Sequence, residues 1–419
     1  MKSKLFSNTL IYGLSGSLVA AIPFLLMPFM TRTLSQGDYG IAIFFSAVLT
    51  LVLPLIGFGS YNALSVRYFQ MDKKKFSSYL WSCIFLSFFS SILLLSFFLI
   101  FSKKILSFSA INWEWFFIAI ITSSFWGISQ ACSSYLIAKA DAIFYLAINF
   151  IIGFFTIFLT IILINFYDLT WNGFAISLFF AHFFAAIFSI YKLIADQNFS
   201  RIRFEYFKDS LKFGVPVMFH TFAMSLISFS DRFIISNHLG LEALGKYSVA
   251  FQLGIVLSFI AQAFNKAFVP WLYENLKKDS FESKLKIVRG TYVIFFMIFI
   301  FSLLFICILD NLILLFAGKE YIDIYDIGII VAVGGAFNAA YLMIVNYVFY
   351  AGKTLRLGVL SFSISIIFII LSLFLTPRFG LYGASFSYAF SNFILFISVW
   401  ILAIKSFSMP WLSKRIISN

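Results

Sequence analysis

The sequence predicts an all-α integral membrane protein, with about twelve transmembrane helices arranged as two pseudo-symmetric six-helix lobes. Composition gives the class, because 62% of the 419 residues are hydrophobic, 11% are charged and the mean hydropathy is +0.99. A soluble domain carries roughly 25% charged residues and under half apolar ones. Since a helix needs roughly 20 residues to cross the hydrocarbon layer, twelve helices use about 240 residues and leave only short connections.

Twelve apolar segments alternate with charged or turn-forming residues along the chain. The first follows Lys2 and Lys4 as a signal peptide would, but it is too long for a signal-peptide core and lacks a small-residue cleavage site. We therefore interpret it as a retained span. The expected spans are residues 8–31, 40–64, 78–101, 112–138, 142–165, 170–193, 211–237, 247–271, 290–310, 324–350, 355–376 and 380–404.

Lysine and arginine are concentrated in alternate gaps between these spans. The odd-numbered hydrophilic regions, counted from the N-terminus, hold 22 of the 30 basic residues; the even-numbered regions hold six, and two lie inside apolar segments. Loops rich in lysine and arginine stay in the cytoplasm. The pattern therefore predicts that the N- and C-termini are both cytoplasmic.

A short stretch of charged and aromatic residues divides the chain into halves. Between residues 198 and 212, apolar residues such as Phe204 and Phe207 alternate with charged ones such as Arg203 and Lys208. This pattern predicts an amphipathic helix that lies in the membrane interface. We expect an N-terminal lobe at 1–194, a cytoplasmic amphipathic linker at 195–210 and a C-terminal lobe at 211–419.

The two halves resemble each other in sequence. Four positions match at offsets between 205 and 214 residues: Leu34 with Leu239, Tyr39 with Tyr247, Lys139 with Lys353, and Gly173 with Gly383. Because each half has an even number of spans, both copies enter the membrane from the same side. An internal duplication of this kind gives lobes related by an axis along the membrane normal, which is typical of transporters.

Composition also argues against several other classes. The formal charge of +13 belongs mostly to the expected cytoplasmic face, where it lies beside anionic lipid headgroups, so we expect no nucleic-acid partner. The three cysteines lie singly in apolar segments, without the spacing of a disulfide framework or a zinc site. No Walker A motif is present. We expect no enzymatic activity, no metal and no cofactor.

Short motifs near the start of each half point to one family. They are Asn8, Pro23 and Pro28 in the first span, Arg32-Thr-Leu34 and Asp38-Tyr39-Gly40 after it, Asp231-Arg232-Phe-Ile-Ile in the seventh span, and Leu239-Gly240 with Gly245-Lys-Tyr247 after that span. Their order and spacing, over the whole chain, resemble the Wzx-type polysaccharide flippases of the multidrug/oligosaccharidyl-lipid/polysaccharide (MOP) exporter superfamily. One departure is Gln36-Gly37 before Asp38, where an acidic residue is common.

The resemblance implies a MATE-like fold in the bacterial inner membrane and a flippase. Such a protein moves an O-antigen or similar oligosaccharide unit, linked to an undecaprenyl pyrophosphate carrier, by alternating access coupled to an ion or proton gradient. Implied partners are this lipid-linked oligosaccharide, membrane lipids, and the polymerase and chain-length proteins of the same pathway.

Three alternatives remain open. A drug/cation antiporter of the same superfamily would need acidic residues deep in the first six spans, which have none at mid-membrane depth. A membrane O-antigen polymerase would have a long outer loop, whereas this chain has short gaps and repeated halves. A flippase for lipid-linked peptidoglycan precursors usually has fourteen spans, which 419 residues accommodate poorly.

Charged residues inside spans are candidates for function, because each costs about 2.5 to 3.5 kcal/mol at the helix centre. Arg232 and Lys266 inside spans, and Arg32 directly after the first span, are the candidates for binding an anionic cargo. Asp231 is a candidate for coupling or for a helix tether. Because adjacent side chains on a helix point about 100° apart, we expect Asp231 and Arg232 to need separate partners. The alternative for Arg232 is a side chain that extends to the membrane interface and a salt bridge between lobes.

His182 is the most central titratable residue and is the second coupling candidate. Small residues share its face, so a hydrogen-bonded histidine in a packed interior is the simpler interpretation. Hinge or packing roles are expected for Pro23, Pro28 and Pro216, and for Gly13 and Gly16 in a stripe of small residues that would let helices approach closely.

Overall fold

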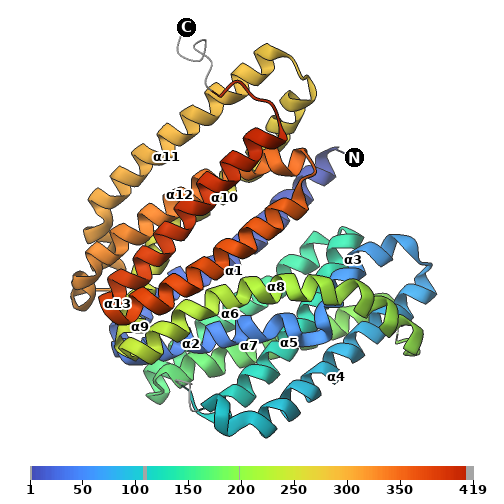
Figure 1. Ribbon diagram of the computed structural model, residues 1–419. Helices are drawn as coiled ribbons and strands as arrows, with labels where there is room; N and C mark the ends of the chain where they lie inside the picture. Colours follow the sequence, from blue (N-terminus) through green and yellow to red (C-terminus); the bar gives the residue numbers. More distant parts are fainter. Residues whose placement is uncertain (1, 107–110, 198, 412–419) are drawn as a thin grey trace. The chain divides into compact units, whose positions relative to one another are not determined.

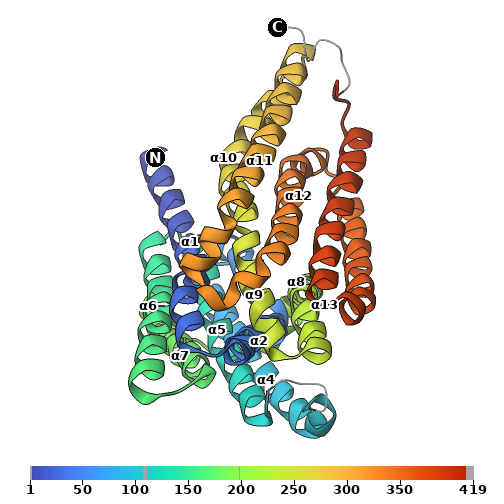
Figure 2. The ribbon, with the colours of Figure 1, turned by 90° about the vertical axis from the view of Figure 1, so that its left-hand side faces the viewer.

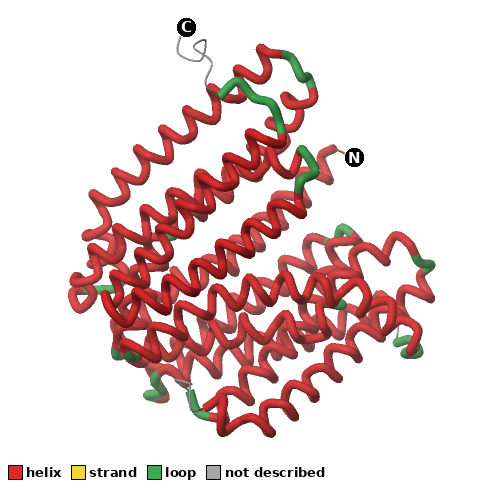
Figure 3. Tube along the Cα trace, in the orientation of Figure 1, coloured by secondary structure: helices red, strands yellow, loops and turns green. Residues whose placement is uncertain are grey.

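The computed structural model describes residues 2–106, 111–197 and 199–411, and its regular secondary structure over these ranges is entirely helical (Figures 1 and 3). The elements are α1 (Lys2–Thr33), α2 (Gln36–Val52), the 3-10 helix η1 (Leu53–Gly59), α3 (Tyr61–Gln70), α4 (Lys73–Leu106), α5 (Trp113–Lys139), α6 (Ala142–Tyr167), α7 (Trp171–Gln197), α8 (Phe204–Leu239), α9 (Leu241–Gly254), α10 (Val256–Lys277), α11 (Phe281–Phe316), the 3-10 helix η2 (Lys319–Ile324), α12 (Tyr325–Tyr350) and α13 (Thr354–Ser406).

Within the described ranges, eleven helical segments are long and apolar enough to cross a membrane. The last, Leu355–Ser406, has 52 residues, which a straight helix would extend over about 78 Å at about 1.5 Å per residue. Gly380 breaks it, with φ 60° and ψ −141°, and a Cβ on Gly383 would lie 2.2 Å from the carbonyl oxygen of Leu375. The chain therefore reverses, α13 forms a hairpin of two spanning arms (Figure 1), and the expected number of twelve spans is confirmed.

The chain divides into two compact units, Met1–Gly245 and Lys246–Asn419. Unit 1 contains α1 to α8 and the start of α9, and unit 2 contains the rest of α9 and α10 to α13. In unit 2, α12 packs along α13 (Figure 2). The lobe limits drawn from the charged linker, 1–194 and 211–419, remain a prediction.

The stretch between α7 and α8 does not form a separate interfacial helix. Residues 199–203 are not helical, and α8 begins at Phe204 and continues to Leu239 without interruption. The non-helical stretch packs on α4, where Arg203 donates its backbone N–H to Ser82 Oγ at 3.1 Å and the ring of Phe199 lies 5.0 Å from that of Trp81. The prediction of an independent amphipathic helix was wrong, because a continuous α8 avoids a second pair of helix ends with unpaired backbone groups.

Repeated residues occupy corresponding places in the two units. Tyr39 and Tyr247 are both buried, in the helices that follow α1 and α8. Gly173 begins α7, where a Cβ would lie 3.1 Å from Ile164 of α6, and Gly383 begins the second arm of α13. Both glycines thus allow the closing turn of a helical hairpin, as an internal duplication requires.

Candidate functional site

Asp231 and Arg232 on α8 pair with each other inside the seventh span. Asp231 is 3% exposed and Arg232 is half-buried. Arg232 Nη1 lies 2.6 Å from Asp231 Oδ2 and 2.7 Å from Oδ1, and the backbone N–H of Arg232 donates to Oδ1 at 2.8 Å. The prediction that adjacent residues cannot neutralise each other was wrong. The flexible arm of arginine lets the guanidinium fold across the angle of about 100° between neighbouring side chains.

The guanidinium of Arg232 points back along α8. Its Nη1 also donates to the carbonyl oxygen of Ser228 at 3.1 Å, one turn closer to the middle of the helix. With α8 running outward as the charge pattern predicts, this direction leads into the membrane. An arginine that extends to the outer interface would point the other way.

The other two cationic candidates are exposed side chains in different units. Arg32 lies in the last turn of α1, in unit 1, and Lys266 lies on α10, in unit 2. Neither unit therefore contains the whole predicted set of Arg32, Arg232 and Lys266.

His182 lies in the packed interior of unit 1. It is 5% exposed, and its ring stacks on Trp126 of α5 with centroids 4.9 Å apart. Its Nδ1 has no hydrogen-bond partner in the part of the chain that the structure describes. The buried position agrees with the sequence, but the expected hydrogen bond is not formed at this nitrogen within the described residues. A coupling role for His182 stays a prediction.

The predicted hinge residues lie within continuous helices. α1 runs through Pro23 and Pro28, and α8 runs through Pro216, without a non-helical residue at any of them. A Cβ added to Gly13 or Gly16 would meet nothing within 4 Å. A packing role for these two glycines stays a prediction. Hinge roles for the prolines remain predictions.

The second span contains a break that the sequence reading treated as continuous helix. α2 ends at Val52 and α3 begins at Tyr61, and between them Gly57, Phe58 and Gly59 have positive φ values of 64°, 51° and 70°. A non-glycine residue such as Phe58 rarely adopts this left-handed conformation. Ser90 Oγ on α4 accepts a hydrogen bond from the Gly57 N–H at 2.7 Å, so the break remains paired inside the lobe.

Glycines of two other helices surround this break. A Cβ on Gly214 of α8 would lie 2.6 Å from the Phe58 carbonyl oxygen, and a Cβ on Gly127 of α5 would lie 2.6 Å from Ile56 Cγ2. The sequence signal was Pro54 followed closely by Gly57 and Gly59 in an apolar run. Interrupted helices near the membrane middle often mark the working centre of transporters.

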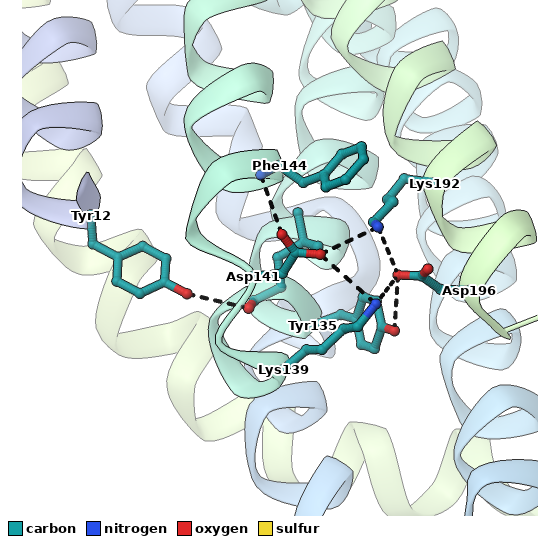
Figure 4. Close-up of polar contacts among 8 residues, drawn as sticks. Tyr12, Tyr135, Lys139, Asp141, Phe144, Lys192 and Asp196 are labelled. Carbon is teal, nitrogen blue, oxygen red and sulfur yellow. Dashed lines mark hydrogen bonds and ion pairs between the residues drawn. The ribbon is translucent and has the colours of Figure 1, made fainter. Parts of the chain in front are cut away.

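Four charged side chains meet at one end of α5, α6 and α7 (Figure 4). Asp196 Oδ2 lies 2.5 Å from Lys139 Nζ and 3.2 Å from Lys192 Nζ, and the hydroxyl of Tyr135 donates to it at 3.2 Å. Asp141 Oδ2 lies 3.3 Å from Lys192 Nζ and 3.8 Å from Lys139 Nζ. We call these four charged residues the charge cluster. Sequence reasoning missed it, although two Lys and Asp pairs at the ends of neighbouring predicted spans were a usable signal.

Metal-binding geometry is not found in the described ranges, where no group of three or more His, Cys, Asp and Glu side chains is placed to hold an ion.

Comparison with known proteins then decides the family. The profile of the family described as "Polysaccharide biosynthesis protein" matches residues 5–276, more than half of the chain. The chain belongs to this family. Its relatives include the provisionally named protein 1 of the Lsg locus of Haemophilus influenzae, which is 24% identical over 378 residues, 87% of this chain and 90% of that protein. A Shigella flexneri protein provisionally named as an O-antigen transporter is 25% identical over 228 residues, 54% of each chain.

Solved structures give the fold. An inward-facing multidrug resistance MATE family transporter of the MOP superfamily matches with a TM-score of 0.68 and 14% identity, over 93% of this chain and 94% of that one. The lipid II flippase MurJ, in an inward closed conformation, matches with a TM-score of 0.67 and 18% identity, over 96% and 88%. This family member is therefore an all-α, multi-pass membrane protein with the two-lobe MOP fold. The two solved structures are a transporter and a flippase, and they show the fold of this chain.

Proposed function

We propose that the chain is a flippase of the bacterial inner membrane, which moves an oligosaccharide linked to undecaprenyl pyrophosphate by alternating access. Membership of a polysaccharide biosynthesis family and the MOP fold support this class of cargo. The relative named for O-antigen transport supports an O-antigen or similar repeat unit. The single observation that carries the proposal is the Asp231–Arg232 pair, whose guanidinium points into the seventh span.

The chemistry of this pair suits a diphosphate cargo. A guanidinium binds phosphate oxygens through paired hydrogen bonds, and an environment with little water strengthens that contact. While Asp231 is ionised, it competes for the same guanidinium. In this scheme Arg232 binds the cargo, and Asp231 couples binding to the ion or proton gradient by competing with the cargo for the same guanidinium.

The test is complementation of surface-polysaccharide display in a flippase-deficient strain, with membrane abundance measured alongside. Arg232→Ala should abolish most display and Arg232→Lys should lose much of it, because lysine keeps the charge but lacks the planar fork. Asp231→Asn should reduce the dependence of display on the proton gradient.

A matched control is available at Arg378, which makes the same type of local bond. Its Nη1 donates to the carbonyl oxygen of Phe374 at 3.2 Å, and its side chain is exposed and forms no ion pair with any residue the structure describes. Arg378→Ala should keep display. Full display by Arg232→Ala would remove Arg232 from the site, and full display by Arg232→Lys would reduce its role to charge alone.

A further inference from the structure

Two amide pairs lie between the helices of unit 2, and one of them presents free donors. Asn346 of α12 donates from Nδ2 to Asn265 Oδ1 of α10 at 2.7 Å. Asn346 is 3% exposed, whereas Asn265 is only half-buried. In the part of the chain that the structure describes, no partner is present for the amide nitrogen of Asn265.

The direction of the Asn265 amide follows from its surroundings. Asn346 Nδ2 also donates to its own helix, to the carbonyl oxygen of Leu342 at 2.8 Å. If the Asn346 amide were turned over, its Oδ1 would lie against the carbonyl oxygen of Leu342, so Nδ2 must face Leu342. The second hydrogen on Nδ2 then needs another acceptor. Asn265 supplies that acceptor with Oδ1. The NH₂ group of Asn265 is therefore directed away from Asn346.

On the surface of α10, Asn265 belongs to a polar sector. Successive residues of a helix are about 100° apart around its axis. Viewed along the axis of α10, Gln262 is therefore about 60° from Asn265, and Lys266 is about 40° beyond Gln262 in the same direction. The three polar side chains thus cover a sector of about 100°. Gln262 and Lys266 are exposed and have no ion pair or hydrogen bond to any described residue. The exposed apolar side chains of Ile260 and Phe264 lie outside the sector. A lysine and two amides on a spanning helix face an aqueous path or a ligand rather than lipid.

We propose that Asn265 is a cargo-contacting residue, which donates to the phosphate oxygens of the cargo beside Lys266, and that Asn346 is a positioning residue that orients its amide. This inference rests on the proposed flippase function for its choice of ligand. The ammonium of Lys266 is charged, and the NH₂ of Asn265 has its direction fixed by Asn346. Both groups are hydrogen-bond donors, and a diphosphate offers only acceptors.

The second amide pair provides a matched control. Asn338 of α12 donates to Asn392 Oδ1 of α13 at 3.0 Å, and Asn392 Nδ2 donates to the carbonyl oxygen of Tyr388 at 2.9 Å. This pair joins two helices of the same unit, as the first one does, but no lysine lies beside it in the sequence. Asn338→Ala therefore removes an equivalent interhelical bond without touching the polar sector of α10.

The experiment measures binding of farnesyl diphosphate to the purified full-length protein, together with melting temperature and surface-polysaccharide display. Asn265→Asp keeps the acceptor for Asn346 but replaces the outward NH₂ with an oxygen, so affinity should fall at least about tenfold with a near-normal melting temperature. Asn346→Leu should also weaken binding, and Asn338→Ala should bind within about twofold of the wild type. Inorganic pyrophosphate serves as a second probe, and weaker binding of it than of farnesyl diphosphate would show that the site takes a lipid-linked diphosphate.

The outcomes separate this site from the proposed function. Unchanged farnesyl diphosphate affinity in Asn265→Asp, or no binding by the wild type, would overturn the site. Equal losses in Asn265→Asp and Asn338→Ala would reduce the amide pair to a helix contact. If the wild type binds the probe through Asn265 but never restores display, the site stands and the cargo assigned under the proposed function is wrong.

Discussion

Replacing Asp196 by asparagine would remove the charge on which two lysines and a tyrosine converge. In the charge cluster, Asp196 Oδ2 accepts from Lys139, Lys192 and the hydroxyl of Tyr135. Asparagine keeps the shape of the side chain but leaves both lysines with the carboxylate of Asp141 as the remaining anion. The formal charge of the cluster changes from zero to plus one.

The expected magnitude follows from how far these side chains are buried. Removing one partner of a fully buried pair costs about 3 to 5 kcal/mol, and an exposed pair contributes about 0 to 1 kcal/mol. The side chains of Lys192 and Asp196 are 9% and 17% exposed, and that of Lys139 is 31% exposed. The burial of the charge cluster is thus intermediate between that of a fully buried pair and that of an exposed pair. We therefore expect Asp196→Asn to lower the free energy of unfolding by about 2 kcal/mol.

The assay is unfolding of the purified protein by SDS titration, followed by tryptophan fluorescence. Asp168→Asn is the matched control, because Asp168 is exposed at the other end of α6 and has φ 52°. Asparagine adopts that conformation readily, so the control should change stability by less than about 0.5 kcal/mol. Equal effects of the two substitutions would refute the reasoning that the cluster stabilises unit 1.

Three further predictions concern packing, topology and His182. Gly214→Ala should lower stability by about 1 to 3 kcal/mol, because its Cβ meets the Phe58 carbonyl oxygen at 2.6 Å, whereas Gly16→Ala should change the melting temperature little. Reporter fusions after Lys75, Lys208, Lys284 and Lys414 should report the cytoplasm, and fusions after Lys104, Lys246 and Arg378 the outer side; two or more inversions would contradict the topology. His182→Gln should keep at least part of the transport measured in the display assay. It should lower stability instead, because the stacking of the His182 ring on Trp126 is lost. Abolished transport at normal membrane abundance would establish a coupling role for His182.

The number and order of spans could be predicted because both depend on composition alone. Hydrocarbon thickness requires long apolar runs, and charged or turn-forming residues separate them, so twelve segments could be read without any tertiary contact. Even the α13 hairpin was expected as two spans, 355–376 and 380–404, with Arg378 in the gap between them. The linker was harder, because charged residues near Phe204 can begin a spanning helix as well as form a separate one.

The broken second span shows a different limit. Apolar composition continues through Gly57 and Gly59, so a hydropathy argument gives one helix. What permits the break is a hydroxyl on another helix, Ser90 Oγ, which accepts the Gly57 N–H. Inside a membrane a freed backbone group needs such a partner. A partner 33 residues away cannot be assigned from one sequence.

Polar contacts inside spans depend on side-chain direction, which residue spacing does not determine. By spacing, Asp231 and Arg232 should point apart, yet the guanidinium reaches the adjacent carboxylate. Asn265 and Asn346, 81 residues apart, meet through amide groups whose orientation is decided by the carbonyl oxygen of Leu342. In both cases few polar groups are available inside the membrane, so each side chain turns to the nearest one. The groups that remain directed elsewhere, such as the NH₂ of Asn265, are then the ones available to a cargo.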